Sequence, residues 1–172
     1  QGGLGVMNLE GVQTKYDDPD EVLNRIADAP KEEATTLLQS IYAAPVKEEL
    51  VGARIDEIKS NGAKCAVSVT PANTKRLGPM AVEAGADILV VQSTVTTAHH
   101  TSNSVRGLVF SELLEMVNVP VVVGNCVSYN VALELMETGI HGVIVGVGPG
   151  AACTTREVTA VGVPQVTATL DC

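Results

Sequence analysis

The sequence predicts an α/β protein with parallel strands, and three observations support this. Short runs rich in Val and Ile alternate with helix-like segments along the whole chain, as in strand–helix–strand units. The runs are almost continuously apolar, which is typical of strands buried on both faces. Apolar residues make up 45% and charged residues 18% of the 172 residues, a balance that supports a sizeable core and excludes a disordered chain.

Five strands are expected, at Leu4 to Leu9, Cys65 to Thr70, Ile88 to Gln92, Val119 to Gly124 and Val143 to Val147. The last four begin 23, 31 and 24 residues apart, a spacing typical of a closed barrel or of a doubly wound sheet. In both architectures the functional residues follow the carboxyl ends of the strands. The segments to inspect are Asn8, Thr70, Gln92 to Thr94, Asn125 to Ser128 and Gly146 to Thr155.

Helical patterns separate the strands. Three helices are expected between the first two strands, the first beginning at Asp18-Pro19, where an N-cap precedes a proline. Later helices are expected to begin at Thr70-Pro71 and at Ser128, and each ends at a glycine. Apolar residues at helical spacing are Ala34, Leu37, Leu38 and Ile41; Leu77, Met80, Ala81 and Ala84; Val109, Leu113, Met116 and Val117; and Val131, Ala132 and Leu135. No Pro-rich linker interrupts this order, so residues 1–172 are expected to form a single domain.

The charge and composition of the chain disfavour nucleic acids and membranes as binding partners. The net charge of −9 repels nucleic acid and anionic membrane surfaces, and one Phe, three Tyr and no Trp offer little for base stacking. An anionic small molecule remains compatible, because backbone N–H groups bind anions locally. The four cysteines form no CxxC pair, and no apolar run approaches the roughly 20 residues of a membrane span. We therefore expect a soluble, cytoplasmic protein with free thiols.

The segment from Gly146 to Glu157 is the strongest candidate for chemistry. Its three glycines allow a turn that presents N–H groups to a phosphate or carbonyl groups to a cation, although a tight strand-to-helix connection is equally compatible. The segment also matches a loose dinucleotide-binding pattern, G-x-G-x-x-A. Pro149 and the short stretch before Gly162 disfavour the long helix which that site needs.

Cys153, within this segment, is a candidate nucleophile, because oriented N–H groups beside a thiol favour its thiolate. Cys65 lies in an apolar strand and is expected to be structural, whereas Cys126 follows a strand and is intermediate. The polar stretch from Thr96 to Ser104, which includes His99-His100, is expected to be a solvated loop rather than a metal site.

With these residues in view, the chain resembles the IMP dehydrogenase / GMP reductase family, and most closely its shorter branch without the CBS regulatory module. The loop around Cys153, followed by Gly162-Val163-Pro164-Gln165, is the specific part of the match. The anchors are Gly2 to Val6, Ala84 to Val91, Gly124 to Ser128, Gly146 to Glu157 and Val161 to Gln165.

The resemblance implies a TIM (β/α)₈ barrel that binds a purine nucleotide monophosphate, IMP. It implies that Cys153 attacks purine C2, that a hydride passes to NAD, and that water then releases XMP. It also implies a monovalent cation, potassium, on loop carbonyl groups, and a homotetramer. The residues are Cys153 and Thr155 for catalysis; Ser93, Thr94, Gly146, Val147 and Gly148 for the cofactor; Asn125, Ala151 and Cys153 for the nucleotide; and Gly148, Gly150 and Cys153 for the cation.

The chain also departs from the family pattern. Gln92 stands where the family usually has an Asp that contacts the cofactor ribose, and Ala151 replaces a Ser that contacts the nucleotide phosphate. The match covers about strands 2 to 6 of the barrel, without the flap that activates water, so a partial barrel that is inactive alone is expected. The stretch from Gly11 to Ala63 is too short for the CBS module.

Three functions remain open. Glu157-Val158 and the segment from Val161 to Gln165 resemble the dehydrogenases and favour NAD-dependent oxidation of IMP. The alternatives are NADPH-dependent conversion of GMP to IMP, and a non-catalytic nucleotide-binding relative, which Gln92 and Ala151 suggest.

Overall fold

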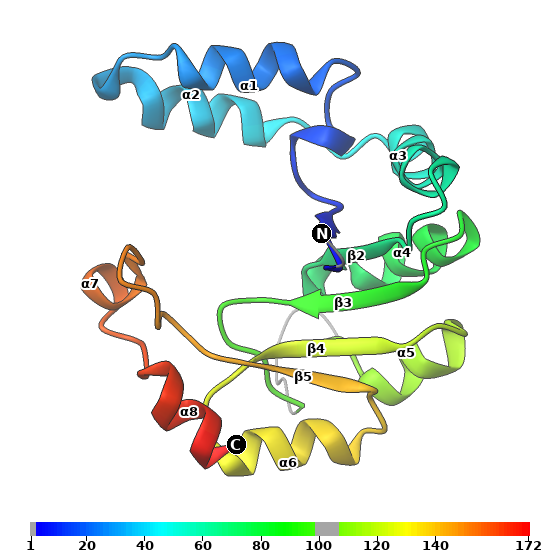
Figure 1. Cartoon of the computed structure of the whole chain (residues 1–172), viewed down its shortest axis with the longest axis vertical. Helices are drawn as coiled ribbons and strands as arrows, with labels where there is room; N and C mark the ends of the chain where they lie inside the picture. The colour runs from blue at the N-terminus through cyan, green and yellow to red at the C-terminus, as the bar shows by residue number, and fades with distance from the viewer. Residues whose placement is uncertain (1–2, 99–106) are drawn as a thin grey trace.

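A sheet of five parallel strands organises the chain. The computed structural model describes residues 3–98 and 107–172, and the strands are β1 (Val6–Asn8), β2 (Ala66–Val69), β3 (Ile88–Gln92), β4 (Val121–Cys126) and β5 (Gly142–Val145). Each strand pairs with the next along the chain, in the order β1-β2-β3-β4-β5 (Figure 1). The predicted α/β class and parallel sheet are confirmed. A sequential order without a reversal is that of an arc of a barrel rather than of a doubly wound sheet.

Helices connect the strands. Between β1 and β2 lie a 3₁₀ turn, η1 (Val12–Thr14), and then α1 (Pro19–Ala27), α2 (Lys31–Ala43) and α3 (Glu48–Ser60). The remaining helices are α4 (Pro71–Glu83), α5 (Phe110–Met116), α6 (Tyr129–Glu137), α7 (Thr155–Thr159) and α8 (Gln165–Asp171). In Figure 1, α4, α5 and α6 lie along the outer side of the sheet, whereas α1 and α2 form a hairpin that projects from it.

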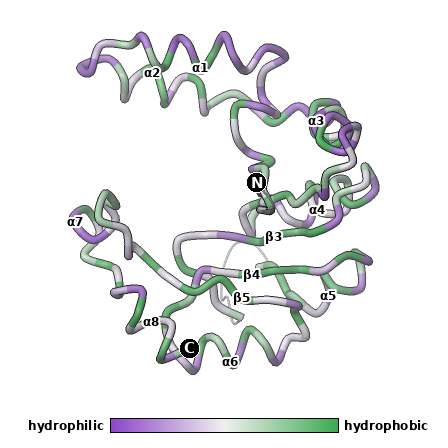
Figure 2. Tube along the Cα trace, viewed as in Figure 1, coloured by the Kyte–Doolittle hydropathy of each residue, from purple (hydrophilic) through white to green (hydrophobic). Residues whose placement is uncertain are grey.

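The core lies between the central strands and the helices that cover them. Leu89 and Val91 of β3 and Val123 of β4 are fully buried or nearly so, as is Leu77 of α4. Figure 2 shows hydrophobic residues along β4, whereas α1 and α2 alternate between hydrophilic and hydrophobic stretches. Val12 of η1, Val22 of α1 and Ile41 of α2 form a second, small cluster.

The prediction that every strand is buried on both faces was wrong for the edges. Val6 of β1 is 48% exposed, and all four residues of β5 are only partly buried. Both strands lie at the edges of the described sheet, so each has a neighbouring strand on one side only and is less covered. Met116, one of the apolar residues at helical spacing, is 51% exposed at the end of α5.

Strand limits differ from prediction for local reasons. β4 begins at Val121, because Pro120 has no N–H to donate, and it continues to Cys126 through a register shift. β5 ends at Val145, because Gly146 has a φ of +128°. Thr96 was predicted to lie in a solvated loop but is only 4% exposed, because its hydroxyl donates to the Gly124 carbonyl oxygen at 2.6 Å. His99 and His100 lie outside the described residues.

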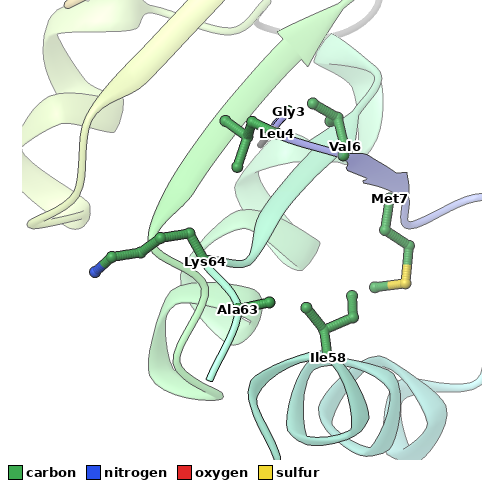
Figure 3. A pocket seen from close by; sticks show the side chains of 8 residues that line it. Gly3, Leu4, Val6, Met7, Ile58, Ala63 and Lys64 are labelled. Carbon is green, nitrogen blue, oxygen red and sulfur yellow. The ribbon is translucent and has the colours of Figure 1, made fainter. Parts of the chain in front are cut away.

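A pocket of about 650 Å³ lies at the opposite end of the sheet from the predicted site (Figure 3). Met7 and Ile58 point toward one another there, and the Lys64 ammonium points away from them. The lining residues are Gly3, Leu4, Gly5, Val6, Met7, Ile58, Ala63 and Lys64. Because Ala63 and Lys64 precede β2, this pocket is at the amino ends of the strands. Among the helices of residues 3–98 and 107–172, none has the length and apolarity to cross a bilayer.

Candidate active site

The carboxyl ends of β3 and β4 are joined by hydrogen bonds around Ser93. Its N–H donates to the Gly124 carbonyl oxygen at 3.0 Å. Its hydroxyl donates to the Val95 carbonyl oxygen at 2.6 Å and lies 2.9 Å from Thr96 Oγ1. Ser93 therefore fixes the turn after β3, while Thr94 is exposed beside it.

Asn125 extends this connection to β5. Its backbone N–H donates to the Ser93 carbonyl oxygen at 3.2 Å, and its side-chain Nδ2 donates to the Gly146 carbonyl oxygen at 2.8 Å. Gly146 N–H donates in turn to the Cys126 carbonyl oxygen at 2.9 Å. The ends of three neighbouring strands, as predicted, thus meet at one edge.

The loop that begins at Gly146 closes on itself. Gly146 and Gly148 have φ values of +128° and +59°, which favour glycine. The Val163 N–H donates to the Val147 carbonyl oxygen at 3.0 Å, so the chain returns to the start of the loop after α7. Gln165 then donates from Nε2 to the Val145 carbonyl oxygen at 3.1 Å.

Cys153 is half-buried within this loop, and its thiol lies 3.3 Å from Thr155 Oγ1. Its backbone N–H donates to the Gly150 carbonyl oxygen at 3.1 Å. Hydrogen bonds from the hydroxyl and the backbone N–H of Thr155 lower the pKa of the Cys153 thiol, and the Arg156 guanidinium adds to this effect. The arrangement favours a nucleophilic thiolate.

The thiol pKa values of Cys65 and Cys126 shift in the opposite direction, upward. Burial raises the pKa of Cys65, which is fully buried as predicted. Burial, with a smaller contribution from Cys172, raises the pKa of Cys126 to about 11, and Cys126 is only 1% exposed. Cys153 is therefore the thiol whose surroundings promote reactivity.

The carbonyl groups predicted to bind potassium, those of Gly148, Gly150 and Cys153, do not fit a metal ion, because the Gly150 oxygen already has a cationic partner. The Gly150 carbonyl oxygen accepts the Cys153 N–H and also accepts Arg156 Nη2 at 3.4 Å. A guanidinium at that oxygen already supplies the positive charge that a monovalent cation would bring.

Comparison with known proteins fits this geometry. The family model of the IMP dehydrogenase / GMP reductase domain matches residues 1–172. The chain belongs to that family. The predicted family is confirmed.

Similar proteins include an uncharacterized oxidoreductase of Mycolicibacterium smegmatis, 38% identical over 176 residues that cover 99% of this chain and 47% of that protein. An inosine-5'-monophosphate dehydrogenase of Cryptosporidium parvum is 47% identical over 92 residues, 53% of this chain and 22% of that protein. The crystal structure of an IMP dehydrogenase/GMP reductase-like protein from Corynebacterium glutamicum superposes with a TM-score of 0.88 at 36% identity, covering 99% of this chain and 45% of that one. The chain spans about half the length of the Mycolicibacterium smegmatis protein and of the Corynebacterium glutamicum protein.

The structure of this IMP dehydrogenase / GMP reductase domain brings together most of the predicted site residues. Ser93, Asn125 and Gly146 form one hydrogen-bonded series, and Cys153 contacts Thr155 in the loop that Gly146 begins. Thr94 and Ala151 are exposed at the same edge. The individual roles of these residues stay predictions.

Two residues that contact the site, Gln165 and Arg156, were given no role in the predictions from the sequence. Gln165 belongs to the tail motif that the sequence shares with the family, yet only the structure shows that its amide reaches back to β5. Arg156 was quoted only as part of the segment, although its Nη2 donates to the Gly150 carbonyl oxygen. Its stem packs over Gly148 and Gly162, which no local pattern in the sequence indicates.

Proposed function

We propose that this chain is the catalytic part of an NAD-dependent oxidoreductase that converts IMP to XMP through a covalent adduct on Cys153. The observation that carries the proposal is the thiol–hydroxyl pair of Cys153 and Thr155, in a Gly-rich loop at the carboxyl edge of the sheet. Membership of the IMP dehydrogenase / GMP reductase family, and oxidoreductase relatives, support it.

The chemistry uses Cys153 twice. Its thiolate forms a bond to purine C2, and the hydrogen on C2 departs with its electron pair. Bound NAD supplies the acceptor for that hydride. Water then adds to C2 and the C2–sulfur bond breaks, so that XMP leaves and the thiol is restored. Splitting the substitution into two steps is the usual advantage of a covalent nucleophile.

Thr155 and the loop prepare the thiolate for attack. The Thr155 hydroxyl stabilises the negative sulfur by a hydrogen bond, and this bond also fixes the direction of the side chain. The bonds that close the loop hold Cys153 in one position relative to β5, which reduces the entropy lost on reaching the reactive geometry.

Asn125 and Ala151 are the nucleotide contacts in this proposal. Asn125 uses an amide hydrogen on Gly146, which fixes the amide direction and presents Oδ1 as an acceptor. Ala151 is exposed and offers a backbone N–H to phosphate, without the hydroxyl that the family usually supplies.

The cofactor is proposed to contact Ser93, Thr94 and the start of the Cys153 loop, from Gly146 to Gly148. The exposed Thr94 hydroxyl and Gln92 amide suit hydroxyl groups of a ribose. The N–H and the carbonyl oxygen of Gly146 are both hydrogen-bonded within the protein. Within Gly146–Gly148 we therefore place the direct contact with the cofactor at Gly148.

Gln92 keeps a second candidate open, the NADPH-dependent conversion of GMP to IMP. An amide, unlike the carboxylate usual at this position, does not repel an additional phosphate on the cofactor. Both candidates use the same Cys153 adduct, and they differ in the nucleotide and cofactor consumed.

The deciding experiment assays the full-length protein that carries this chain. NADH formation with IMP and NAD is compared with NADPH consumption with GMP, and mass spectrometry looks for a purine adduct on Cys153. We expect NADH formation, an adduct, and loss of about three orders of magnitude of turnover in Cys153→Ala with nucleotide binding retained. Cys172→Ala is the matched control, a second half-buried thiol that should leave turnover unchanged.

Each alternative has its own outcome. NADPH consumption with GMP, without NADH formation from IMP, assigns the reductase reaction. Nucleotide binding without either reaction assigns a non-catalytic relative. Turnover that survives Cys153→Ala rejects the covalent mechanism for both enzymes.

A further inference from the structure

The exposed side chain of Arg156 lies against the loop that carries Cys153. Its Nη2 donates to the Gly150 carbonyl oxygen at 3.4 Å. Gly150 also accepts the N–H of Cys153 at 3.1 Å, so one carbonyl group joins the arginine to the backbone of the nucleophile.

The aliphatic stem of Arg156 is held by two glycines. A Cβ placed on Gly162 would lie 2.2 Å from Arg156 Cγ and 2.7 Å from its Cδ, and a Cβ on Gly148 would lie 3.2 Å from Cγ. The stem therefore occupies space that side chains at these positions would fill. The two glycines come from opposite ends of the loop, so the arginine spans it.

This placement conflicts with a cation bound at the Gly150 carbonyl oxygen. Gly148 and Gly150 are two of the three residues predicted to hold potassium. Arg156 donates to the Gly150 carbonyl oxygen, and its stem lies beside Gly148. A guanidinium and a metal ion that share one carbonyl oxygen repel one another. The arginine, being covalently attached, has the advantage of a very high local concentration.

We propose that Arg156 is the built-in cation of this loop, a positioning residue that takes the place of a monovalent metal ion. The loop is then ordered without potassium. The inference rests on the proposed function only in treating Cys153 as the group to be positioned, because the contacts of Arg156 exist without substrate.

The test is hydrogen exchange of the backbone amides from Gly148 to Thr155 in the full-length protein, without nucleotide. Potassium chloride is compared with tetramethylammonium chloride at equal ionic strength. We expect the same exchange in both salts for the native protein. In Arg156→Gln we expect exchange about tenfold faster in tetramethylammonium and slowed again by potassium, which can then reach the vacated Gly150 carbonyl oxygen.

Three variants sharpen the result. Arg156→Lys retains a cation and should exchange more slowly than Arg156→Gln. Gly162→Ala keeps the arginine but displaces its stem, so it should acquire potassium dependence as well. Arg25→Gln on α1 makes the same charge change at an exposed position outside the loop and should match the native protein.

Two outcomes would overturn the proposal. One is a native loop whose protection falls about tenfold when potassium is replaced. The other is an Arg156→Gln loop that either stays as protected as the native one or loses protection equally in both salts, which would leave only a packing role. Because exchange is measured without turnover, an inactive but potassium-independent protein would count against the proposed reaction and not against the role of Arg156.

Discussion

Gln165 holds the end of β5 from a position twenty residues further along the chain. Its Nε2 donates to the Val145 carbonyl oxygen at 3.1 Å, and its Oε1 lies 2.3 Å from where a Cβ on Gly146 would be. The same Nε2 also donates to Thr169 Oγ1 at 3.2 Å, within α8. The residue that begins α8 thus bonds to the last residue of β5, directly before the Cys153 loop.

Removing this amide should loosen the loop more than it destabilises the protein. In Gln165→Ala we expect a loss of about 0.5–1.5 kcal/mol in the free energy of unfolding, because one net hydrogen bond to the backbone disappears. Alkylation of Cys153 by iodoacetamide should become faster as the loop opens. Gln39→Ala, on the exposed face of α2, is the control. Equal alkylation rates in the two variants would show that Gln165 does not restrain the loop.

The reactivity of Cys153 should depend on pH through Thr155. Iodoacetamide reacts with the thiolate, and the lowered pKa of Cys153 places the rise in its alkylation rate below the pH expected of an ordinary thiol, about 8.5. Thr155→Val removes the hydroxyl that contributes most to that lowering, so the rise should move to higher pH. Mass spectrometry of the alkylated peptide measures it. An unchanged profile in Thr155→Val would remove the hydroxyl from the explanation.

The fold was predictable from the sequence because its strands and helices have distinct patterns. The β-branched runs identified all five strands, and the limits of β3, Ile88–Gln92, agree with the prediction. Asp18 caps α1 as predicted, accepting the Glu21 N–H at 3.0 Å. Burial of the edge strands was not predictable, because an apolar run carries no information about whether a second neighbour is present.

The site was predictable in its parts but not in its connections. Glycines and a cysteine in one segment indicated the Cys153 loop, but no local pattern shows that Asn125 bonds to Gly146 or that Thr96 is buried against Gly124. These contacts join residues about twenty to thirty positions apart, so they depend on the strand order. The contact of Arg156 with Gly150 was not predictable for a related reason: nothing in the spacing shows that this side chain turns back onto the loop.

Asp87 should make stability depend on pH. Its carboxylate accepts the Cys65 N–H at 2.9 Å and pairs with Lys59 at 2.9 Å and Lys64 at 3.1 Å, and these contacts, the Cys65 N–H first, lower its pKa. The pKa of Asp87 is lower in the folded than in the unfolded protein. Its contribution is therefore fully present above the unfolded value of about 4 and is lost as the pH falls below it.

Asp87→Asn tests this sign. The variant should unfold at lower urea concentration than the native protein at pH 7. The difference should shrink as the pH falls below about 4, because Asp87 then binds a proton in the unfolded chain while the folded protein keeps it charged, which favours unfolding of the native protein. Asp56→Asn makes the same charge change on the exposed face of α3 and should show no such convergence. A gap that stays constant with pH would assign the effect to packing rather than to charge.

Gly124 and Gly52 provide a matched pair of substitutions with opposite expected signs. A Cβ on Gly124 would lie 2.5 Å from Ile144 Cβ and 2.7 Å from the Ile144 carbonyl oxygen, so Gly124→Ala must push β4 and β5 apart. We expect a loss of about 1–3 kcal/mol, as for other overpacked cores. Gly52, inside α3, has open space around its Cα, so Gly52→Ala should stabilise by about 0.5–1 kcal/mol through helix propensity. Urea unfolding of both variants measures the two signs. A Gly124→Ala protein as stable as the native one would show that β4 and β5 are not packed this closely at the edge where Asn125 meets Gly146.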